Sequence, residues 1–433
     1  MTERLNVLLC VIDGARADYL SCYGHPRQTT PFLDEMAREG VRFPHMVASA
    51  PWTLPVLASL LTGKAVVAHG AHEEHRSLDA ASKTLAEYLK TAGYRTAAFC
   101  TNPSVSPDSG FGRGFDVFFT QRYGNRLLTS AVSLARRVVD RLLRRTDAGA
   151  RRSNRALKRW VGRSSAPFFA LLHYNEAQIG ADLPPPYDRM YLPRGVTPAV
   201  ARKLVRGIAA GGSDATFDSR DHSDVLRARY EGALHYVDRR IREVADLLRQ
   251  RGEWSHTLVV VTADHGIGLG EHGRVGHASG LHDELLRVPL LIRCPRVVPE
   301  GFVVEEIAQT TDVAPTILDL LAIQEDGERV QGRALLSGGR SSPGPAFAVA
   351  ERFRGGGEIR CKAIRTKRDK FVWRSDEANE FYDLIADPGE TQNLIEQEIE
   401  RADLLRRQLF DWLAWVEGAA GDEAPSQAAG QGA

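Results

Sequence analysis

The sequence predicts an α/β protein, with a large, mostly parallel sheet flanked by helices and a small α+β subdomain near the C-terminus. Short apolar runs alternate with helical stretches over most of the chain, a pattern typical of strands buried on both faces of a parallel sheet. With 433 residues, the chain also exceeds what one hydrophobic core usually holds. We therefore expect one large unit and one smaller unit.

Five apolar runs form the predicted sheet, and helical stretches separate them. The runs are Val7–Ile12, Thr96–Cys100, Phe168–His173, Thr257–Thr262 and Val288–Ile292. The helical stretches include Ala81–Thr91, Arg227–Arg251 and Asp283–Leu286. Ligands of such sheets bind at the carboxyl ends of the strands. Asp13 and Asp264 come just after two of the runs, so we expect them to share a site.

The character of the chain changes after about Ile323. We predict a main α/β domain over residues 1–325, a linker or surface loop over 326–345, a small subdomain over 346–416 and a disordered tail over 417–433. The stretch Cys361–Arg374 has the pattern of a hairpin that turns at Thr366–Asp369, and a helix is expected to end near Val416. The tail is mostly Ala, Gly, Gln and acidic residues, a composition typical of disorder.

The composition argues against some classes of function. The net charge of +1 gives no global argument for binding nucleic acid, and we expect no such partner. No stretch reaches the roughly 20 apolar residues that a transmembrane helix needs. The five cysteines are scattered and odd in number, which suits reduced thiols and a cytoplasmic location.

One segment, residues 126–163, is strongly basic. Its apolar residues have the spacing of an amphipathic helix. Contact with an anionic surface is one interpretation. The other is a solvated helix face over the core, which we favour because the whole chain is nearly neutral.

Three clusters carry residues suited to chemistry on an anion. Asp13 offers a hard oxygen donor for a divalent cation, although an Asp after a strand is often only a helix cap. Asp264 and His265 offer one oxygen and one nitrogen, and the four histidines between Asp264 and His282 favour a metal site. Thr53 precedes a predicted helix, where its hydroxyl could cap the helix or attack an ester held by free N–H groups.

Taken together, these clusters resemble the sulfatase family of the alkaline phosphatase superfamily. The resemblance runs from Asn6 to about Leu394. Its motifs, in chain order, are Asp13–Asp18, Cys22–Gly24, Thr30–Asp34, Gly40–Phe43, Ala58–Gly63, Gly110–Asp116, Asp264–Gly273, Glu284–Ile292, Tyr382–Leu384 and Asp387–Glu390. The resemblance implies an alkaline-phosphatase-like sheet and makes residues 1–325 the catalytic domain.

The resemblance also implies one divalent metal ion with four ligands: Asp13, Thr53, Asp264 and His265. Mn²⁺, Mg²⁺, Ca²⁺ and Zn²⁺ all remain open as the ion. A histidine after Asp264 would assist the leaving group as a general acid. We expect His277 in this role, with His272 as the alternative.

The sequence departs from true sulfatases at the nucleophile. They carry Cys or Ser at position 53, oxidised to formylglycine, and Arg at position 57, whereas this chain has Thr53 and Leu57. Oxidation of Thr would give a ketone rather than the aldehyde that forms the required hydrate. Thr nucleophiles occur in relatives that cleave or transfer phosphoryl groups through a phospho-threonine intermediate. We therefore expect phosphate mono- or diesters as substrates.

Further departures concern the metal and the substrate. Gly14 stands where a second Asp is often seen, and Gln178 stands near the position of a usual histidine. The resemblance implies substrate contacts from Asn102, His173 and Gln178. Asn102 precedes Pro103, so it is equally well explained as a turn starter.

Three hypotheses remain. The first, which we prefer, is a hydrolase or transferase of phosphate esters that uses Thr53 as its nucleophile. The second is a sulfate ester hydrolase that works without formylglycine. The third is a degenerate family member that binds an anionic ligand or partner without turnover. A small phosphate or sulfate ester is the expected partner in the first two.

Overall fold

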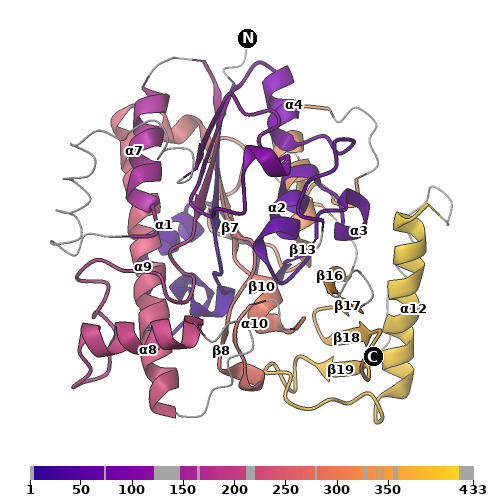
Figure 1. Cartoon of the computed structure of the whole chain (residues 1–433). Helices are drawn as coiled ribbons and strands as arrows, with labels where there is room; N and C mark the ends of the chain where they lie inside the picture. Colours follow the sequence, from indigo (N-terminus) through magenta and orange to yellow (C-terminus); the bar gives the residue numbers. More distant parts are fainter. Residues whose placement is uncertain are drawn as a thin grey trace.

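The protein is built on an eight-stranded sheet, formed within the residues that the computed structural model describes (4–72, 75–120, 147–162, 166–210, 220–277, 280–324, 330–337, 340–342, 346–354 and 359–418). The strand order is β12-β2-β11-β7-β1-β6-β4-β5 (Figure 1). The strands are β1 (Asn6–Ile12), β2 (Val41–Arg42), β4 (Arg95–Cys100), β5 (Val117–Thr120), β6 (Phe168–Tyr174), β7 (Thr257–Ala263), β11 (Leu290–Arg293) and β12 (Phe302–Val303).

The centre of this sheet is parallel. β1 pairs in parallel with β6 and β7, and β4 pairs in parallel with β5 and β6. β11 runs antiparallel to both β7 and β2. The central strands are apolar and fully buried, as strands covered on both faces must be. The predicted α/β class is confirmed.

Helices cover both faces of the sheet, as Figure 1 shows, with α1, α7 and α9 on one side and α2 and α4 on the other. The first group consists of α1 (Pro31–Arg38), α7 (Ala150–Val161), α8 (Pro198–Ala210) and α9 (Arg220–Gln250). The second consists of α2 (Thr53–Thr62), α3 (Val66–His69), α4 (Leu85–Thr91) and α11 (Val313–Leu320). Short 3₁₀ turns lie between the helices and strands. They are η1 (Ala17–Tyr19), η2 (Ser21–Tyr23), η3 (Pro107–Ser109), η4 (Trp254–His256), η5 (Glu271–Gly273) and η6 (Thr310–Asp312).

The helix expected over Ala81–Thr91 begins later, at Leu85. Thr84 and Glu87 form a capping box: the Thr84 hydroxyl accepts from the backbone N–H of Glu87, and the Glu87 carboxylate accepts from the backbone N–H of Thr84. This exchange satisfies two N–H groups that have no partner inside the helix and fixes its first residue.

The strand predicted over Val288–Ile292 is two strands in the structure. β10 (Arg287–Val288) belongs to a small sheet with β3 (Met46–Val47) and β13 (Ala308–Gln309), whereas β11 belongs to the main sheet. Pro289 lies between them and has no N–H with which to continue a ladder. The apolar run was identified correctly, but the prediction that it forms a single strand was wrong.

The C-terminal part is an antiparallel sheet covered by one helix. Its elements are β16 (Ala348–Arg354), β17 (Ile359–Arg365), β18 (Asp369–Arg374), β19 (Glu380–Asp383) and α12 (Ile399–Val416). The sheet order is β16-β17-β18-β19, and β17 and β18 form the predicted hairpin. Phe371, Phe381 and Leu409 belong to a second core between this sheet and α12. The predicted small α+β subdomain is confirmed.

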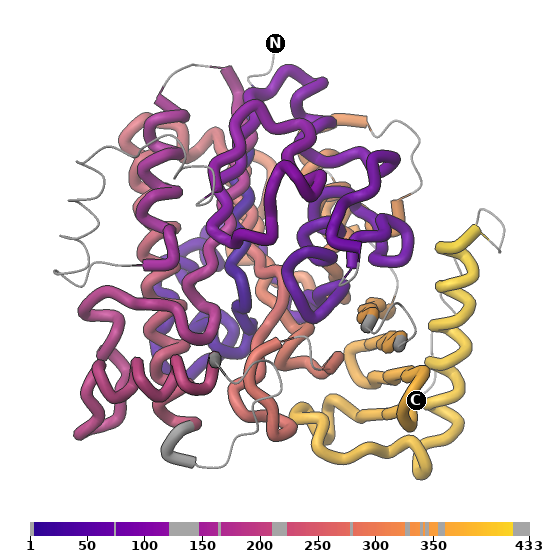
Figure 2. Tube along the Cα trace, in the orientation of Figure 1, coloured from indigo at the N-terminus to yellow at the C-terminus, as the bar shows by residue number. Residues whose placement is uncertain are grey.

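Ion pairs fasten this subdomain to α10 (Asp283–Leu286). The Asp283 carboxylate lies 2.8 Å from the Arg365 guanidinium and 3.0 Å from Lys370 Nζ. Lys370 is fully buried and lies 2.8 Å from Glu390 as well. Figure 2 shows the chain around α10 beside the C-terminal sheet.

Residues 326–345 were predicted as a linker or surface loop. Their described part includes a short hairpin of β14 (Leu336–Ser337) and β15 (Arg340–Ser341), and Leu335 and Leu336 are buried. A second short hairpin, β8 (Gly268–Leu269) with β9 (Val275–Gly276), lies near α10 in sequence. Most of the predicted disordered tail, residues 419–433, lies outside the described residues, and the domain boundaries stay predictions.

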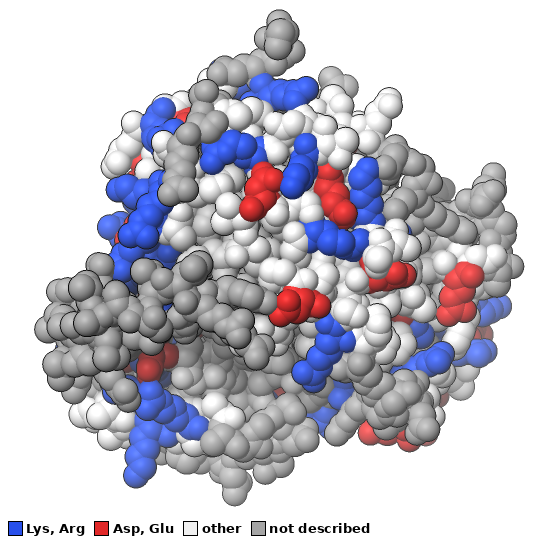
Figure 3. Space-filling view, turned by 45° about the horizontal axis from the view of Figure 1, so that its top comes forward, with Lys and Arg blue, Asp and Glu red and all other residues white. Residues whose placement is uncertain are grey.

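The basic segment 126–163 is described only from residue 147 to 162. There α7 buries Leu157 and Trp160 and exposes Arg155, Lys158 and Arg159. On the face shown in Figure 3, acidic and basic side chains both occur among the described residues. Contact with an anionic surface stays a prediction.

Within the described residues, no helix has the length and apolar character needed to cross a bilayer. The five cysteines are free thiols. The cytoplasmic location stays a prediction.

The central strand β1 should dominate the stability of the main sheet. Leu9 is fully buried there, so Leu9→Ala is expected to lower the free energy of unfolding by about 2–5 kcal/mol through lost burial and the cavity it leaves. Leu404→Ala on the half-exposed face of α12 is the matched control and should change it by less than about 1 kcal/mol. Urea denaturation measures both; equal losses would contradict the prediction.

Candidate active site

The parallel register of β1 and β7 brings the two predicted carboxylates together. Ile12 pairs with Ala263, so the next residues, Asp13 and Asp264, leave the sheet side by side. β6 lies on the other side of β1 and places His173 opposite Val11. The side chains of Asp13, Asp264 and His173 are fully buried. The expected meeting of Asp13 and Asp264 is therefore observed.

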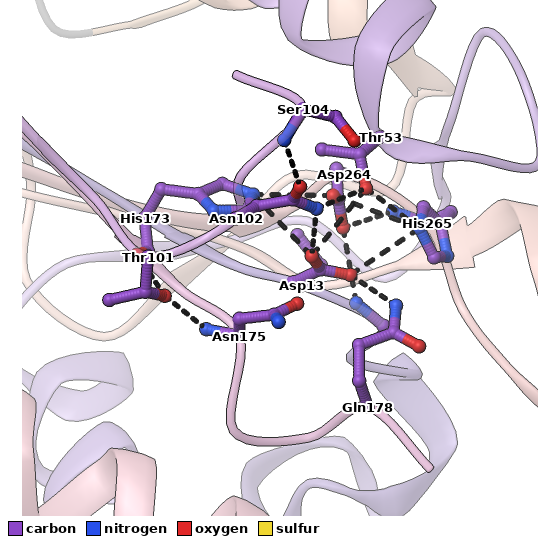
Figure 4. A network of polar contacts seen from close by, with 12 residues as sticks. Asp13, Thr53, Thr101, Asn102, Ser104, His173, Asn175, Gln178, Asp264 and His265 are labelled. Atoms are coloured by element: carbon purple, nitrogen blue, oxygen red, sulfur yellow. Dashed lines mark hydrogen bonds and ion pairs between the residues drawn. The ribbon is translucent and has the colours of Figure 1, made fainter. Parts of the chain in front are cut away.

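Thr53 reaches the same point from α2, whose first residue it is (Figure 4). Its Oγ1 lies 3.5 Å from Asp13 Oδ2 and 3.3 Å from His265 Nε2. Every residue of α2 is buried, so the helix is fixed on all sides. The N-cap position of α2 is Trp52, whose side chain makes no capping hydrogen bond, and the Thr53 hydroxyl is turned toward the carboxylates.

His265 presents one particular nitrogen to this group. Its Nδ1 lies 2.7 Å from the carbonyl oxygen of Gly266, so Nδ1 carries the proton and donates it there. Nε2 then carries no proton and presents its lone pair to the group. It lies 3.5 Å from Asp13 Oδ1 and 3.8 Å from Asp264 Oδ2. A backbone carbonyl that fixes the tautomer in this way is the usual partner of a histidine that binds a metal.

The donor set fits a divalent cation. One oxygen from each of Asp13 and Asp264 and one nitrogen of His265 lie within 4.8 Å of one another. Burial, followed by the charge of Asp264, raises the pKa of Asp13. Burial alone would also raise the pKa of Asp264, but His265 and His173 outweigh it and hold that pKa below its usual range. Two buried carboxylates this close call for positive charge between them.

With the Thr53 hydroxyl, the set offers three oxygens and one nitrogen. Such oxygen-rich sets suit Mg²⁺, Mn²⁺ and Ca²⁺, and Zn²⁺ also accepts them. The four residues predicted as ligands are those that the structure brings together: Asp13, Thr53, Asp264 and His265.

The three residues predicted to contact substrate all border the same group. The Asn102 amide donates to Asp13 Oδ2 at 2.9 Å and to Thr53 Oγ1 at 3.3 Å. His173 Nε2 lies 3.3 Å from Asp264 Oδ2, and the Gln178 amide donates to Asp13 Oδ1. Each of these side chains can therefore hold a carboxylate in place as well as meet an ester.

The two histidines predicted as general acids lie in different surroundings. The His277 ring lies 4.6 Å from the His265 ring, and its buried Nδ1 has no hydrogen-bond partner. Burial, followed by the charge of His265, lowers the pKa of His277 to about 3. Both nitrogens of His272 are engaged elsewhere, by Glu284 and by the backbone carbonyl of Glu390. The geometry therefore favours His277 over His272.

The structure adds supports that the sequence did not reveal. The Tyr230 hydroxyl, on α9, donates to the carbonyl of Gly14 and accepts from the N–H of Arg16, both at 2.8 Å. Gly14 has a φ of 76°, which favours glycine, and its N–H donates to Asp264 Oδ1 at 3.1 Å. Nothing in the spacing of α9 marks Tyr230 among its other buried residues.

Gly266, the residue after His265, allows another segment of the chain to approach closely. A Cβ at Gly266 would lie 2.1 Å from the backbone oxygen of Glu284. The Gly266 N–H donates to the Leu285 carbonyl at 2.7 Å. This glycine therefore lets α10, rather than a ligand, approach the strand end.

Comparison with known proteins identifies the family. A sequence model of the family Sulfatase matches residues 5–323, and one described as N-sulphoglucosamine sulphohydrolase, C-terminal, matches residues 270–414. The first match covers well over half of the chain. The chain belongs to the sulfatase family.

Relatives of this sulfatase-family protein include one named as an alkaline phosphatase superfamily protein and one named as an arylsulfatase. The multifunctional alkaline phosphatase superfamily protein PehA of Trinickia caryophylli is 28% identical, covering 77% of this chain and 76% of its own. An arylsulfatase of Clostridium perfringens is 26% identical, covering 94% of this chain and 93% of its own. The crystal structure of phosphonate monoester hydrolase of Agrobacterium radiobacter matches with a TM-score of 0.78 at 23% identity, covering 96% of each chain. The predicted family and superfamily are thus confirmed.

Beside the site, Glu176 should make the stability of the protein depend on pH. Burial, followed by the charge of Asp147, raises the pKa of Glu176 from 4.5 to about 8. The folded state therefore holds an extra proton between about pH 4.5 and 8, and the stability that this proton gives is lost as the pH rises through that window.

The variant Glu176→Gln imitates the protonated form and should not lose this stability. Relative to wild type, its free energy of unfolding is expected to increase by on the order of 1–4 kcal/mol between about pH 5 and pH 9. Urea denaturation across this range measures the difference. The exposed Glu400→Gln is the control, and parallel pH profiles for wild type and Glu176→Gln would refute the prediction.

Proposed function

We propose that this sulfatase-family protein is a metal-dependent hydrolase, or transferase, of phosphate mono- or diesters with Thr53 as its nucleophile. The observation that carries the proposal is the position of Thr53 Oγ1, 3.3 Å from His265 Nε2 and 3.5 Å from Asp13 Oδ2 at the first turn of a buried helix. A hydroxyl needs activation to attack an ester, and this group of side chains is suited to supply it.

Asp13, Asp264 and His265 would hold the ion, with Thr53 beside it. When bound, a divalent ion lowers the pKa of the attacking hydroxyl and offsets the charge that develops on the ester. Asn102 would orient the nucleophile, because its amide donates to both Thr53 and Asp13. The free N–H groups at the start of α2 favour an anionic ester at the same place.

The reaction then has two displacements. Thr53 Oγ1 forms a bond to phosphorus as the bond to the leaving alcohol breaks, and its own proton passes to solvent. Without substrate, burial keeps His277 unprotonated at neutral pH. The negative charge of a bound ester would favour the protonated ring, which then donates its proton to the leaving oxygen and is protonated again by solvent. Water, or a second alcohol, cleaves the phospho-threonine and restores the Thr53 hydroxyl.

Sulfate ester hydrolysis without formylglycine is the second candidate. It is favoured by the arylsulfatase of Clostridium perfringens, whose similarity covers 94% of this chain. Against it stands Leu57, which is fully buried where true sulfatases carry a charged Arg. Binding without turnover is the third candidate, and the same assays distinguish all three.

Removing the Thr53 hydroxyl should abolish turnover. Thr53→Ala is expected to lower kcat/KM for an aryl phosphate by about 10³-fold or more, because the proposed covalent bond needs this hydroxyl. Thr53→Ser keeps the hydroxyl and should retain activity. Assays use aryl phosphate, bis-aryl phosphate and aryl sulfate with Mn²⁺, Mg²⁺, Ca²⁺ or Zn²⁺ added in turn.

Asp264→Asn is expected to lose both the metal and the activity. Intact-protein mass spectrometry with a slow substrate should detect a phosphate adduct on Thr53 in the wild type. Release of sulfate alone would favour the second candidate. Metal uptake without turnover of any ester would leave the third, and full activity in Thr53→Ala would eliminate the proposed nucleophile.

The role of His277 has a distinct kinetic signature. A general acid matters most when the leaving group is a poor one, so His277→Gln should lower turnover of alkyl phosphates by about 10²–10⁴-fold. Turnover of 4-nitrophenyl phosphate, whose leaving group needs no proton, should change by less than about tenfold. Equal losses on both substrates would show that His277 only positions its neighbours. His75→Gln, an exposed histidine outside the site, is the control.

A further inference from the structure

We propose that His272 is a positioning residue, which holds the β8–β9 hairpin against the C-terminal subdomain and thereby sets the position of His277. This role rests on the proposed function, in which His277 is the general acid. The hairpin begins three residues after His265, η5 forms its tip, and His277 comes directly after β9. The orientation of the hairpin therefore decides where the His277 backbone leaves it.

His277 has little support of its own. Its ring packs against the His265 ring at 4.6 Å, and within the described part of the chain its buried Nδ1 has no hydrogen-bond partner. The residue before it, Gly276, pairs with Gly268 in the two-stranded ladder of the hairpin. The ring is therefore placed by packing and by the hairpin, rather than by a hydrogen bond from its Nδ1.

Arg16 joins the hairpin to the main domain. Its Nη1 donates to the backbone carbonyl of Ile267 at 3.2 Å and to Glu271 Oε1 at 2.8 Å. The other carboxylate oxygen of Glu271 accepts from the N–H of Leu269 at 2.6 Å. A second contact, on the side of the C-terminal subdomain, is needed to fix the orientation of so short a hairpin.

His272 supplies that contact from the tip. Its Nδ1 lies 2.9 Å from Glu284 Oε1, and its Nε2 lies 3.0 Å from the backbone carbonyl of Glu390. The ring also stacks on the His282 ring, with centroids 3.9 Å apart and planes 14° apart. All three partners lie outside the hairpin, so one side chain ties its tip both to α10 and to the loop after β19.

Protonation strengthens these contacts. Both polar partners of His272 are acceptors, and a neutral imidazole can donate to only one of them, whereas the imidazolium donates to both. The hydrogen bond and charge of Glu284 raise the pKa of His272 from 6.5 to about 9, although burial opposes them. The titratable groups that face the ring are Glu284, His282 and Glu390, and Lys370 lies 2.8 Å from the Glu390 carboxylate.

The backbone is left-handed on both sides of the same hydrogen bond. His272 has a φ of 51° and Glu390 a φ of 54°. Glycine adopts this conformation without strain, yet both positions carry side chains. A strained residue persists where its surroundings determine it and is often found at a functional site. The conformation of His272 therefore fits a side chain that is needed for its contacts.

The variant His272→Asn tests this role. Asn tolerates the left-handed backbone, but its shorter side chain cannot bridge Glu284 and Glu390. Turnover of an alkyl phosphate should fall by about 10–100-fold, whereas turnover of 4-nitrophenyl phosphate should change by less than about threefold. Hydrogen exchange of residues 268–277, measured by mass spectrometry without substrate, should become about tenfold faster, while β1 is unchanged. His75→Asn is the control and should match wild type in every measurement.

The variant Glu284→Gln adds a pH signature. It keeps an acceptor oxygen but removes the charge, so the pKa of His272 should fall from about 9 toward 6.5. Because the folded-state pKa is raised, the stabilisation from His272 is full below about pH 6.5 and is lost as the pH rises through about 9. The ratio of alkyl to 4-nitrophenyl phosphate turnover in Glu284→Gln should therefore lie about tenfold below that of wild type at pH 8 and approach it near pH 6.

The outcomes separate this role from the proposed function. Faster exchange at residues 268–277 together with a selective loss of alkyl phosphate turnover supports it. Unchanged exchange in His272→Asn overturns it, whatever the activity. Equal losses on both substrates, or a ratio in Glu284→Gln that equals that of wild type at pH 8, overturn it as well. The exchange measurement needs no substrate, so it still decides whether His272 holds the hairpin if Thr53→Ala keeps full activity.

Discussion

Two buried carboxylates at the ends of neighbouring parallel strands are the constraint on which the rest of the site depends. Asp13 and Asp264 are fully buried, and each makes it costly for the other to be charged. The surrounding groups offset that cost in part: an amide from Asn102, an amide from Gln178 and the N–H of Gly14 all donate to these oxygens. The divalent cation of the proposed function would complete the balance. The register of β1 and β7 makes this arrangement unavoidable, because a shift of either strand would separate the charges.

The proposed nucleophile, Thr53, depends on a different kind of support. Thr53 begins a helix whose residues are all buried, so packing fixes the helix, and hydrogen bonds with Asp13 and Asn102 orient the hydroxyl. Ser59, on the buried side of the same helix, accepts a hydrogen bond from Ser49 Oγ at 2.9 Å, and its Oγ lies 3.0 Å from His69 Nε2. These contacts satisfy the Ser59 hydroxyl inside the core. An apolar helix cannot contribute a charged group, and Leu57 illustrates this, since it packs in the core. The charge at the site must therefore come from Asp13 and Asp264 at the strand ends and, in the proposed function, from the metal ion.

The strands and the meeting of Asp13, Asp264 and His265 could be predicted from the sequence, because apolar runs of strand length followed by polar residues leave few alternatives. The division at Pro289 could also have been anticipated, since proline cannot continue a central ladder. The support from Tyr230 could not, because the periodicity of α9 shows which face is buried but not which buried hydroxyl reaches Gly14. Similarly, the glycine at 266 predicts close approach, whereas only the fold reveals that α10 is the segment that approaches.

The histidines between Asp264 and His282 look like one cluster in the sequence, but the fold divides them. His265 and His277 pack together at the strand ends, whereas His272 and His282 stack against the C-terminal sheet. Donor chemistry differs in the same way, with oxygens dominant in the buried group and imidazoles dominant in the more exposed one. One short segment therefore serves two places: His265 and His277 lie at the buried strand ends, whereas His272 and His282 make the contact with the C-terminal sheet.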